Sequence, residues 1–217
     1  MGAGVDPALV LLALTSVLLL GSSRLTRGIR IVAFQGILLG GLTVAAHAHE
    51  LSARVVALAL LILALKGAAF PWLLSRVLQR ADVRREVEPL VSYIISMMAG
   101  TLALAFSFWL SARLPLPSLP ISTLAVPVAL FTTQVGLFLI VSRRTALMQV
   151  LAYLVLENGI YTFGVGVVQG TPMIVELGIL LDVFVAVFVM GIAIFHINRE
   201  FDHIDANQLT LLTDWTG

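Results

Sequence analysis

The sequence contains no cysteine, and only 12% of its 217 residues are charged. Without cysteine, the chain cannot form disulfides, hold cysteine-ligated iron–sulfur clusters or use thiol catalysis. A soluble domain carries about a quarter charged residues, so the shortage of charge excludes an ordinary soluble fold. The formal net charge of +1 says little, because in a membrane protein the positions of the charges carry the information. These absences indicate a membrane protein without thiol chemistry of its own.

Apolar residues make up 59% of the chain, and the mean hydropathy is +1.04. Charge-poor segments recur at about the 20 residues that span a bilayer. The sequence therefore predicts an all-α polytopic membrane protein, one integral membrane domain over residues 1–217 with about seven transmembrane helices. The first span carries Asp6 and has no basic segment before it, so we expect a mature helix and not a signal peptide. The predicted spans are about 5–22, 29–48, 51–75, 90–111, 121–142, 145–168 and 172–196, with a short cytoplasmic tail over 197–217.

Basic residues fall mostly on one side of a seven-span chain. Lys and Arg resist translocation and collect on the cytoplasmic side. Only Arg54 and Arg113 fall on the opposite side. We therefore predict a protein of the cell inner (cytoplasmic) membrane, with its N-terminus outside and its C-terminus in the cytoplasm. The arginines on the predicted cytoplasmic side are Arg24, Arg27, Arg30, Arg76, Arg80, Arg84, Arg85, Arg143, Arg144 and Arg199.

Three ionisable residues, Glu157, Asp182 and Lys66, lie in the middle of apolar spans. From the helical rise, Glu157 and Asp182 lie roughly 18 and 20 Å from the cytoplasmic ends of their helices, and Lys66 roughly 15 Å from Arg76. All three are expected near the bilayer midplane, where an ionised group is costly and is normally retained for proton, ion or substrate handling. A shared layer is what a lateral proton relay needs, so we predict that these residues form a proton path. Pro71 after Lys66 removes a helical hydrogen bond and opens the backbone locally.

The sixth predicted span carries a polar stripe. Gln149, Tyr153, Glu157 and Tyr161 follow one another at i, i+4 spacing and so share one helix face. That face must lie against protein or a wetted cavity, because unsatisfied polar groups in hydrocarbon are costly. Gln149, Tyr153 and Tyr161 are therefore candidates for a relay or supporting role.

The seventh predicted span repeats this pattern more weakly. Asp182 and His196 are fourteen residues apart and lie on nearly the same face. Glu176 lies about 120° away and near the outer end of the span, so we read it as interfacial. His196 and Glu176 complete the set of possible supporting residues.

Structural interpretations stay open beside the functional ones. A buried Lys–carboxylate pair also holds helices together, and tyrosine hydroxyls are more often packing groups than relay members. Gly36 and Gly40 match the small-xxx-small pattern of close helix contact. The run 132–134, Thr-Thr-Gln, is expected to hydrogen-bond within or between helices.

Other polar groups lie at the ends of spans. His47, His49 and Glu50 stand close together, but their short spacing at an interface favours solvated residues, and we predict no metal site. The mixed-sign stretch 80–88 predicts a solvated cytoplasmic loop or a docking edge for a soluble partner. Membrane lipid is the expected surrounding, and no nucleic-acid partner is expected.

One long stretch carries a family pattern: QVLAYLVLENGIYTFGVGVVQGTPMIVELGILLDVFVAVFVMGI, followed by HIDANQLTLL. In it the chain resembles the hydrogenase-4 component E family of membrane subunits. The similarity is specific over about residues 143–212 and looser before, where Lys66 with Pro71 looks like the family's Lys and Pro in the third helix. The matching positions are Glu157-Asn158-Gly159, Val175-Glu176-Leu177-Gly178, Asp182, Gln208-Leu209-Thr210 and the preceding Ser142-Arg143.

The resemblance implies a place in a formate hydrogenlyase or energy-converting nickel–iron hydrogenase complex related to respiratory complex I. It implies last three helices similar to the NuoK-type subunit, with Glu157 and Asp182 in the places of that subunit's two intramembrane glutamates. Nickel–iron and iron–sulfur centres would belong to soluble hydrogenase and iron–sulfur subunits, and this chain would hold no cofactor. Antiporter-like subunits and a quinone-cavity-like subunit would be its membrane neighbours.

Our hypothesis is a non-catalytic membrane-arm subunit of such an oxidoreductase complex. Electron transfer in the partners would drive proton exchange among Lys66, Glu157 and Asp182. A structural scaffold subunit of the same kind of complex is the first alternative. A stand-alone secondary transporter is the second, although such proteins usually show internal repeats and helices broken by Gly or Pro.

Overall fold

The computed structural model describes residues 4–22, 24–48, 52–80, 90–115, 121–167 and 191. Every regular element in this part of the chain is helical, and five helical segments are long and apolar enough to cross a membrane, beside a shorter apolar one at the N-terminus. The all-α polytopic membrane class is thereby confirmed. The elements are α1 (Val5–Leu20), α2 (Leu25–Ala46), α3 (Ala53–Ile62), η1 (Leu63–Ala69), α4 (Phe70–Arg80), α5 (Tyr93–Ser111), α6 (Ala125–Ser142) and α7 (Ala146–Val167).

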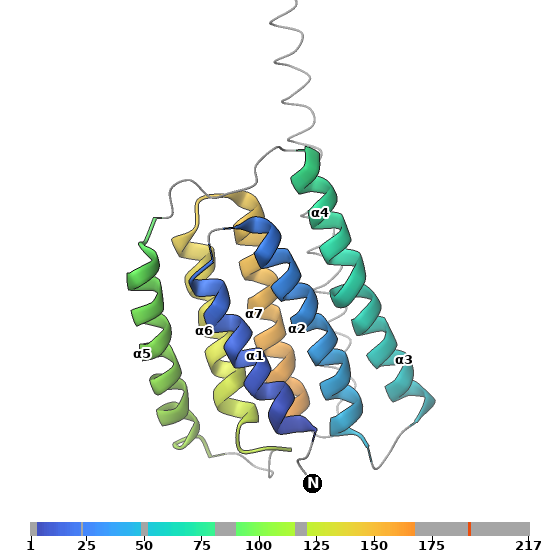
Figure 1. The fold of residues 1–217 in the computed structure, drawn as a ribbon. Coiled ribbons are helices and arrows are strands. Elements are labelled where there is room, and N and C mark those ends of the chain that lie inside the picture. The colour runs from blue at the N-terminus through green and yellow to red at the C-terminus, as the bar shows by residue number, and fades with distance from the viewer. Residues whose placement is uncertain are drawn as a thin grey trace, which may run out of the picture.

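The helices form two layers, with one further helical segment at each side (Figure 1). In the view of Figure 1, α1 and α2 lie in front of α6 and α7, α5 stands at one edge, and the continuous rod α3–η1–α4 stands at the other. Helix α7 packs against α6 and α2, whereas η1 packs against α2. The buried apolar side chains between the layers include Leu25, Phe131, Val135 and Val155. Helices α2 and α7 thus occupy the middle of the bundle.

Most helix ends lie within a few residues of the expected spans, and two differ for a clear reason. α2 begins at Leu25, four residues before the expected position 29, because its first turns contain Arg27 and Arg30 yet bury Leu25 and Ile29. The rod continues to Arg80, beyond the expected position 75, because an apolar face continues through the polar stretch after Pro71 and stays buried. The expected seventh span, 172–196, and the tail, 197–217, lie outside the described residues.

The rod is interrupted by a π-helix over Leu63–Ala69, the segment that contains Lys66. The backbone N–H of Phe70 donates to the carbonyl oxygen of Leu65, five residues earlier. Pro71 explains this widening, because it has no N–H to donate and its ring would collide with the carbonyl of residue 67 in a regular α-helix. Single π-turns of this kind are frequent at functional sites. The local opening expected near Pro71 therefore surrounds the lysine itself.

Glycines bring the helix backbones into direct contact at two places. A Cβ on Gly36 would lie 2.5 Å from the carbonyl carbon of Lys66, and one on Gly40 would lie 3.4 Å from the carbonyl oxygen of Ala59. A Cβ on Gly136 would overlap the backbone of Leu156, and one on Gly159 would lie 2.5 Å from the backbone nitrogen of Thr133. The close contact expected from the Gly36–Gly40 pattern is present, and α6 and α7 have a second contact of the same kind.

Arg143, one of the basic residues predicted on the cytoplasmic side, is buried in the structure. It lies in the connection between α6 and α7, its side chain is completely buried, and its Nη2 donates to the carbonyl oxygen of Leu20 at 3.0 Å. Its guanidinium also lies 4.9 Å from the centre of the Tyr93 ring. A cation on the last carbonyls of a helix satisfies them and complements the helix dipole. Arg143 therefore caps the C-terminal end of α1. The side of the membrane at which it lies stays a prediction.

Candidate functional site

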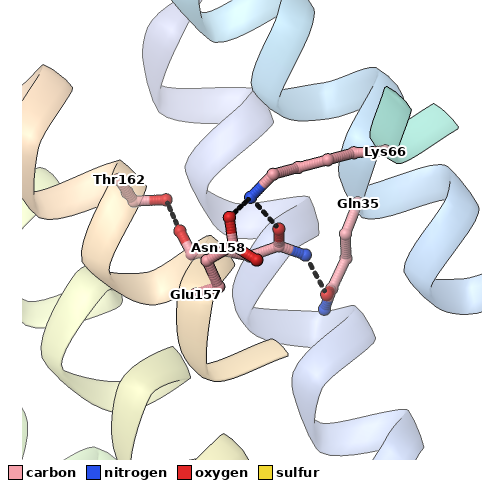
Figure 2. A network of polar contacts seen from close by, with 5 residues as sticks. All are labelled: Gln35, Lys66, Glu157, Asn158 and Thr162. Carbon is pink, nitrogen blue, oxygen red and sulfur yellow. Dashed lines mark hydrogen bonds and ion pairs between the residues drawn. The ribbon is translucent and has the colours of Figure 1, made fainter. Parts of the chain in front are cut away.

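Lys66 and Glu157 form an ion pair inside the bundle (Figure 2). Lys66 comes from η1 and Glu157 from the middle of α7, and Nζ lies 2.8 Å from Oε1. Their side chains are only 4% and 2% exposed. The structure thus brings together two of the three predicted midplane groups, and the third, Asp182, lies outside the described residues. Their role in a proton path stays a prediction.

One turn of α7 surrounds the lysine ammonium. Besides the Glu157 carboxylate, Nζ donates to Oδ1 of Asn158 at 3.3 Å and lies 5.6 Å from the centre of the Tyr161 ring. An aromatic face attracts a cation, more strongly where water is excluded. The ammonium therefore faces a carboxylate, an amide oxygen and a ring, all supplied by residues 157–161.

Two of these three groups, the Asn158 amide and the Tyr161 ring, are also hydrogen-bonded to helix α2. Nδ2 of Asn158 donates to Oε1 of Gln35 at 3.1 Å. The Thr43 hydroxyl donates to the carbonyl oxygen of Leu39 at 2.8 Å, so the Tyr161 hydroxyl donates to Thr43 across their 2.7 Å contact. Gln35 and Thr43 thereby fix the Asn158 amide and the Tyr161 ring against Lys66.

The hydrogen bonds continue from Gln35 to α1. Nε2 of Gln35 donates to the hydroxyls of Thr15 and Ser16, at 3.1 and 3.2 Å. Both hydroxyls in turn lie within hydrogen-bond distance of backbone carbonyls of their own helix, at 2.8 to 2.9 Å. All these side chains are buried, with Gln35 and Ser16 fully covered. A polar chain therefore crosses the apolar bundle from α7 and η1 through α2 to α1.

This arrangement can hold one ion pair in a low-dielectric interior. Two buried charges are tolerated only where their attraction and further hydrogen bonds offset the loss of hydration. An ammonium and a carboxylate 2.8 Å apart are within the distance at which a proton passes directly between them. The same geometry also fits a purely structural clamp between η1 and α7.

The predicted stripe on α7 is covered only in part. Glu157 and Tyr161 are buried and Tyr153 is half-buried, whereas Gln149 is exposed on this chain and donates to the backbone oxygen of Arg143 at 3.1 Å. The supporting roles of Gln149, Tyr153 and Tyr161 stay predictions. The other two candidates, Glu176 and His196, lie outside the described residues.

Two residues of the run 132–134 make the hydrogen bonds expected of them, whereas the buried Thr132 hydroxyl has no partner among the described residues. The Thr133 hydroxyl donates to the carbonyl oxygen of Ala129 at 2.8 Å, and Gln134 donates from Nε2 to the Ser107 hydroxyl of α5 at 3.0 Å. His47 lies with Nδ1 3.0 Å from the carbonyl oxygen of Thr43, and its sequence neighbours at 49 and 50 are outside the described part of the chain. Only the bond between Gln134 and Ser107 joins two helices, and none of these contacts involves the ion pair.

Sequence reasoning missed Gln35, Thr15, Ser16 and Thr43 as members of the site. Gln35 carried a usable signal, because a lone amide inside the apolar run IVAFQGILLG must find a buried partner. The hydroxyls of Thr15, Ser16 and Thr43 carried none, since such residues satisfy themselves on their own helix and are common in membrane spans.

Comparison with known proteins finds one relative over almost the whole length. The uncharacterized protein Rv0085 of Mycobacterium tuberculosis is 33% identical over 206 residues, which cover 94% of this chain and 93% of that protein. Hydrogenase-4 component E of Escherichia coli is 38% identical over 88 residues, 41% of this chain and 41% of that protein, and the Shigella flexneri protein of that name matches equally. No family model matches the sequence, and no solved structure does.

Proposed function

This chain belongs to the same family as the Mycobacterium tuberculosis protein Rv0085, and from that premise we propose that it is a membrane subunit of a hydrogenase-type complex with a part in proton transfer. The proposed complex rests on the partial similarity to hydrogenase-4 component E, which spans 41% of each chain. The proposed proton transfer rests on one observation, the 2.8 Å contact between Lys66 and Glu157 in the buried centre of the bundle. Ionisable groups at that depth are normally functional.

In this proposal the chemistry of electrons belongs to partner subunits. Soluble subunits would carry the nickel–iron and iron–sulfur centres, and antiporter-like and quinone-cavity-like subunits would adjoin this chain in the membrane of the cell. The sequence supports such a division, because it has no cysteine to ligate a cluster. This chain would contribute a segment of the lateral proton path, in which Lys66 and Glu157 exchange a proton and Asp182 continues the path.

The proposal is tested with Glu157→Gln in the assembled complex, reconstituted in vesicles with electron donor and acceptor. Glutamine keeps the size of the side chain and can accept a hydrogen bond from Lys66, but it takes up no proton. We expect proton translocation per electron to fall to less than half, while electron transfer continues. The measurements are the pH change in the vesicle lumen and the rate of electron transfer in the same sample.

Asp6→Asn is the matched control, because Asp6 is an exposed carboxylate at the start of α1 that bonds only to Ser122 among the described residues. It should leave both rates unchanged. A complex with Glu157→Gln that assembles and translocates protons like wild type would overturn the proposal. That result would favour the scaffold alternative, in which the buried pair serves only to join η1 to α7.

A further inference from the structure

The hydrogen-bond chain from α1 to Lys66 has a fixed direction, and α1 sets it. The hydroxyl of Thr15 lies 2.9 Å from two backbone carbonyls of its own helix, and that of Ser16 lies 2.8 Å from one. Carbonyls only accept, so the hydroxyl hydrogens point to them and the hydroxyl oxygens are left to accept. Gln35 must therefore present its NH₂ group to α1 and its oxygen to Asn158.

The lysine sets the same direction from the opposite end. An ammonium has three donors and no acceptor, so Asn158 must present its oxygen to Lys66 and its NH₂ group to Gln35. If the two amides were turned over, the Asn158 NH₂ group would face a cation, and Gln35 would present its oxygen to hydroxyls that already donate elsewhere. Both ends of the chain thus select one arrangement, the one that the structure contains.

We propose that Gln35 is a positioning residue for proton exchange between Lys66 and Glu157, acting through Asn158. The amide chain holds Asn158 Oδ1 on one N–H of the lysine, while the Tyr161 ring covers another direction of Nζ. Glu157 Oε1 lies 2.8 Å from Nζ and accepts another of its N–H groups. This inference rests on the proposed function for its role in proton transfer, although the positioning itself is a property of the chain alone.

The proton step balances within the pair. The Nζ–H bond that faces Glu157 breaks, its electron pair stays on Nζ, and a new O–H bond forms on the carboxylate. The products are a neutral amine and a neutral carboxylic acid, so the pair as a whole keeps its charge. The amine still donates to Asn158 after the step, and its lone pair still faces Glu157, which makes the reverse step equally direct.

The hydrogen-bond chain through Asn158 and Gln35 does not carry protons toward α1. Side-chain amides neither take up nor release protons in the ordinary pH range. A proton that reaches Lys66 therefore cannot continue through Asn158 and Gln35 to Thr15 and Ser16. The amides orient the lysine and do not conduct.

Lys66 is the only lysine in the sequence, which gives a specific spectroscopic probe. The full chain is labelled with ¹⁵Nζ-lysine and ¹³C-asparagine and studied by magnetic resonance in lipid nanodiscs at one pH. We expect a through-space cross-peak between Lys66 Nζ and the Asn158 carboxamide carbon in wild type, lost in Gln35→Met. Gln35→Glu in its protonated form should retain the cross-peak, because its carbonyl oxygen accepts from Nδ2 of Asn158 and its O–H donates to Thr15 or Ser16.

Gln134→Met is the matched control, since it removes an amide–hydroxyl bond between two other helices. It should keep the wild-type cross-peak. A cross-peak unchanged in Gln35→Met would overturn the inference, because Asn158 would then keep its place without Gln35. A cross-peak lost equally in Gln134→Met would also overturn it, because a general loss of packing would then explain the data.

In the reconstituted complex, Gln35→Met should slow proton translocation about tenfold through misplacement of the reacting groups. Gln35→Glu should recover much of the rate at a pH where its carboxyl group is protonated. If Glu157→Gln leaves proton translocation unchanged but the cross-peak is lost in Gln35→Met, the proposed function fails and the positioning stands. If Glu157→Gln blocks translocation while Gln35→Met changes neither the cross-peak nor the rate, the positioning fails alone.

Discussion

Replacing Lys66 with methionine is expected to lower the free energy of unfolding by about 3–5 kcal/mol, the usual loss when one partner of a buried ion pair is removed. Methionine fills most of the space of the lysine stem, so the loss reports the charge and not a cavity. The Glu157 carboxylate is only 2% exposed, and in the variant it loses the ammonium 2.8 Å away. Glu157→Met should be similarly costly, since it leaves the ammonium in the same buried place.

The double variant distinguishes a coupled pair from two independent losses. Replacing both members of a buried pair by apolar residues of similar volume is often nearly neutral, so Lys66→Met with Glu157→Met should lose about 1–2 kcal/mol at most. The measurement is unfolding of the full chain by dodecyl sulfate in mixed micelles, followed by circular dichroism. Losses that simply add in the double variant would show that the two charges do not stabilise each other.

Arg76→Met provides the control for loss of a cation from the same rod. Arg76 is exposed, and its guanidinium lies 5.2 Å from the centre of the Trp72 ring. A cation–π contact at an exposed site contributes about 0.5–1 kcal/mol, which sets the upper limit of the expected loss. A loss as large as that of Lys66→Met would indicate that the rod tolerates no change of charge, whatever its burial.

Alanine substitution should have opposite effects at two glycines of α2. A Cβ on Gly36 would lie 2.5 Å from the carbonyl carbon of Lys66, and backbone cannot move aside as a flexible side chain can. We expect Gly36→Ala to cost about 1–3 kcal/mol and to push η1 away from α2. A Cβ on Gly41 would meet no atom within 4 Å, so Gly41→Ala should gain up to about 1 kcal/mol from helix propensity.

The two alanine variants are compared in the same unfolding assay, each against wild type. The cross-peak between Lys66 Nζ and Asn158 adds a local readout, which Gly36→Ala should weaken and Gly41→Ala should not. Equal effects at the two positions would contradict the close approach of η1 to α2. The contrast is internal, because both glycines lie on one helix only five positions apart.

Hydropathy alone was enough to predict the class of fold and the approximate extent of the described helices. The reason is physical, since a bilayer requires long apolar segments whose internal hydrogen bonds are complete. The depth of Lys66 and Glu157 could also be estimated, because the rise per residue of an α-helix is known. Shared depth made their contact possible, and the structure shows that they make it.

Lateral neighbours could not be predicted in this way. Gln35 and Asn158 are 123 positions apart, and nothing in a hydropathy pattern says that α2 lies between α1 and the lysine. Arg143 shows the same limit: its position between two spans can be predicted, but its contacts with α1 and the start of α5 cannot. Packing between distant segments decides both cases.

The uneven packing of the bundle has a mechanical consequence for the ion pair. In the most apolar window of α7, 72% of the residues are buried, and glycine contacts lock this helix to α6. The corresponding figure for the rod that carries Lys66 is 22%, and the lysine lies in its widened π-helical turn. Segments with few buried contacts move at the lowest cost. If the distance between Nζ and Oε1 changes, we therefore expect the rod with the cation to move more than the helix with the carboxylate.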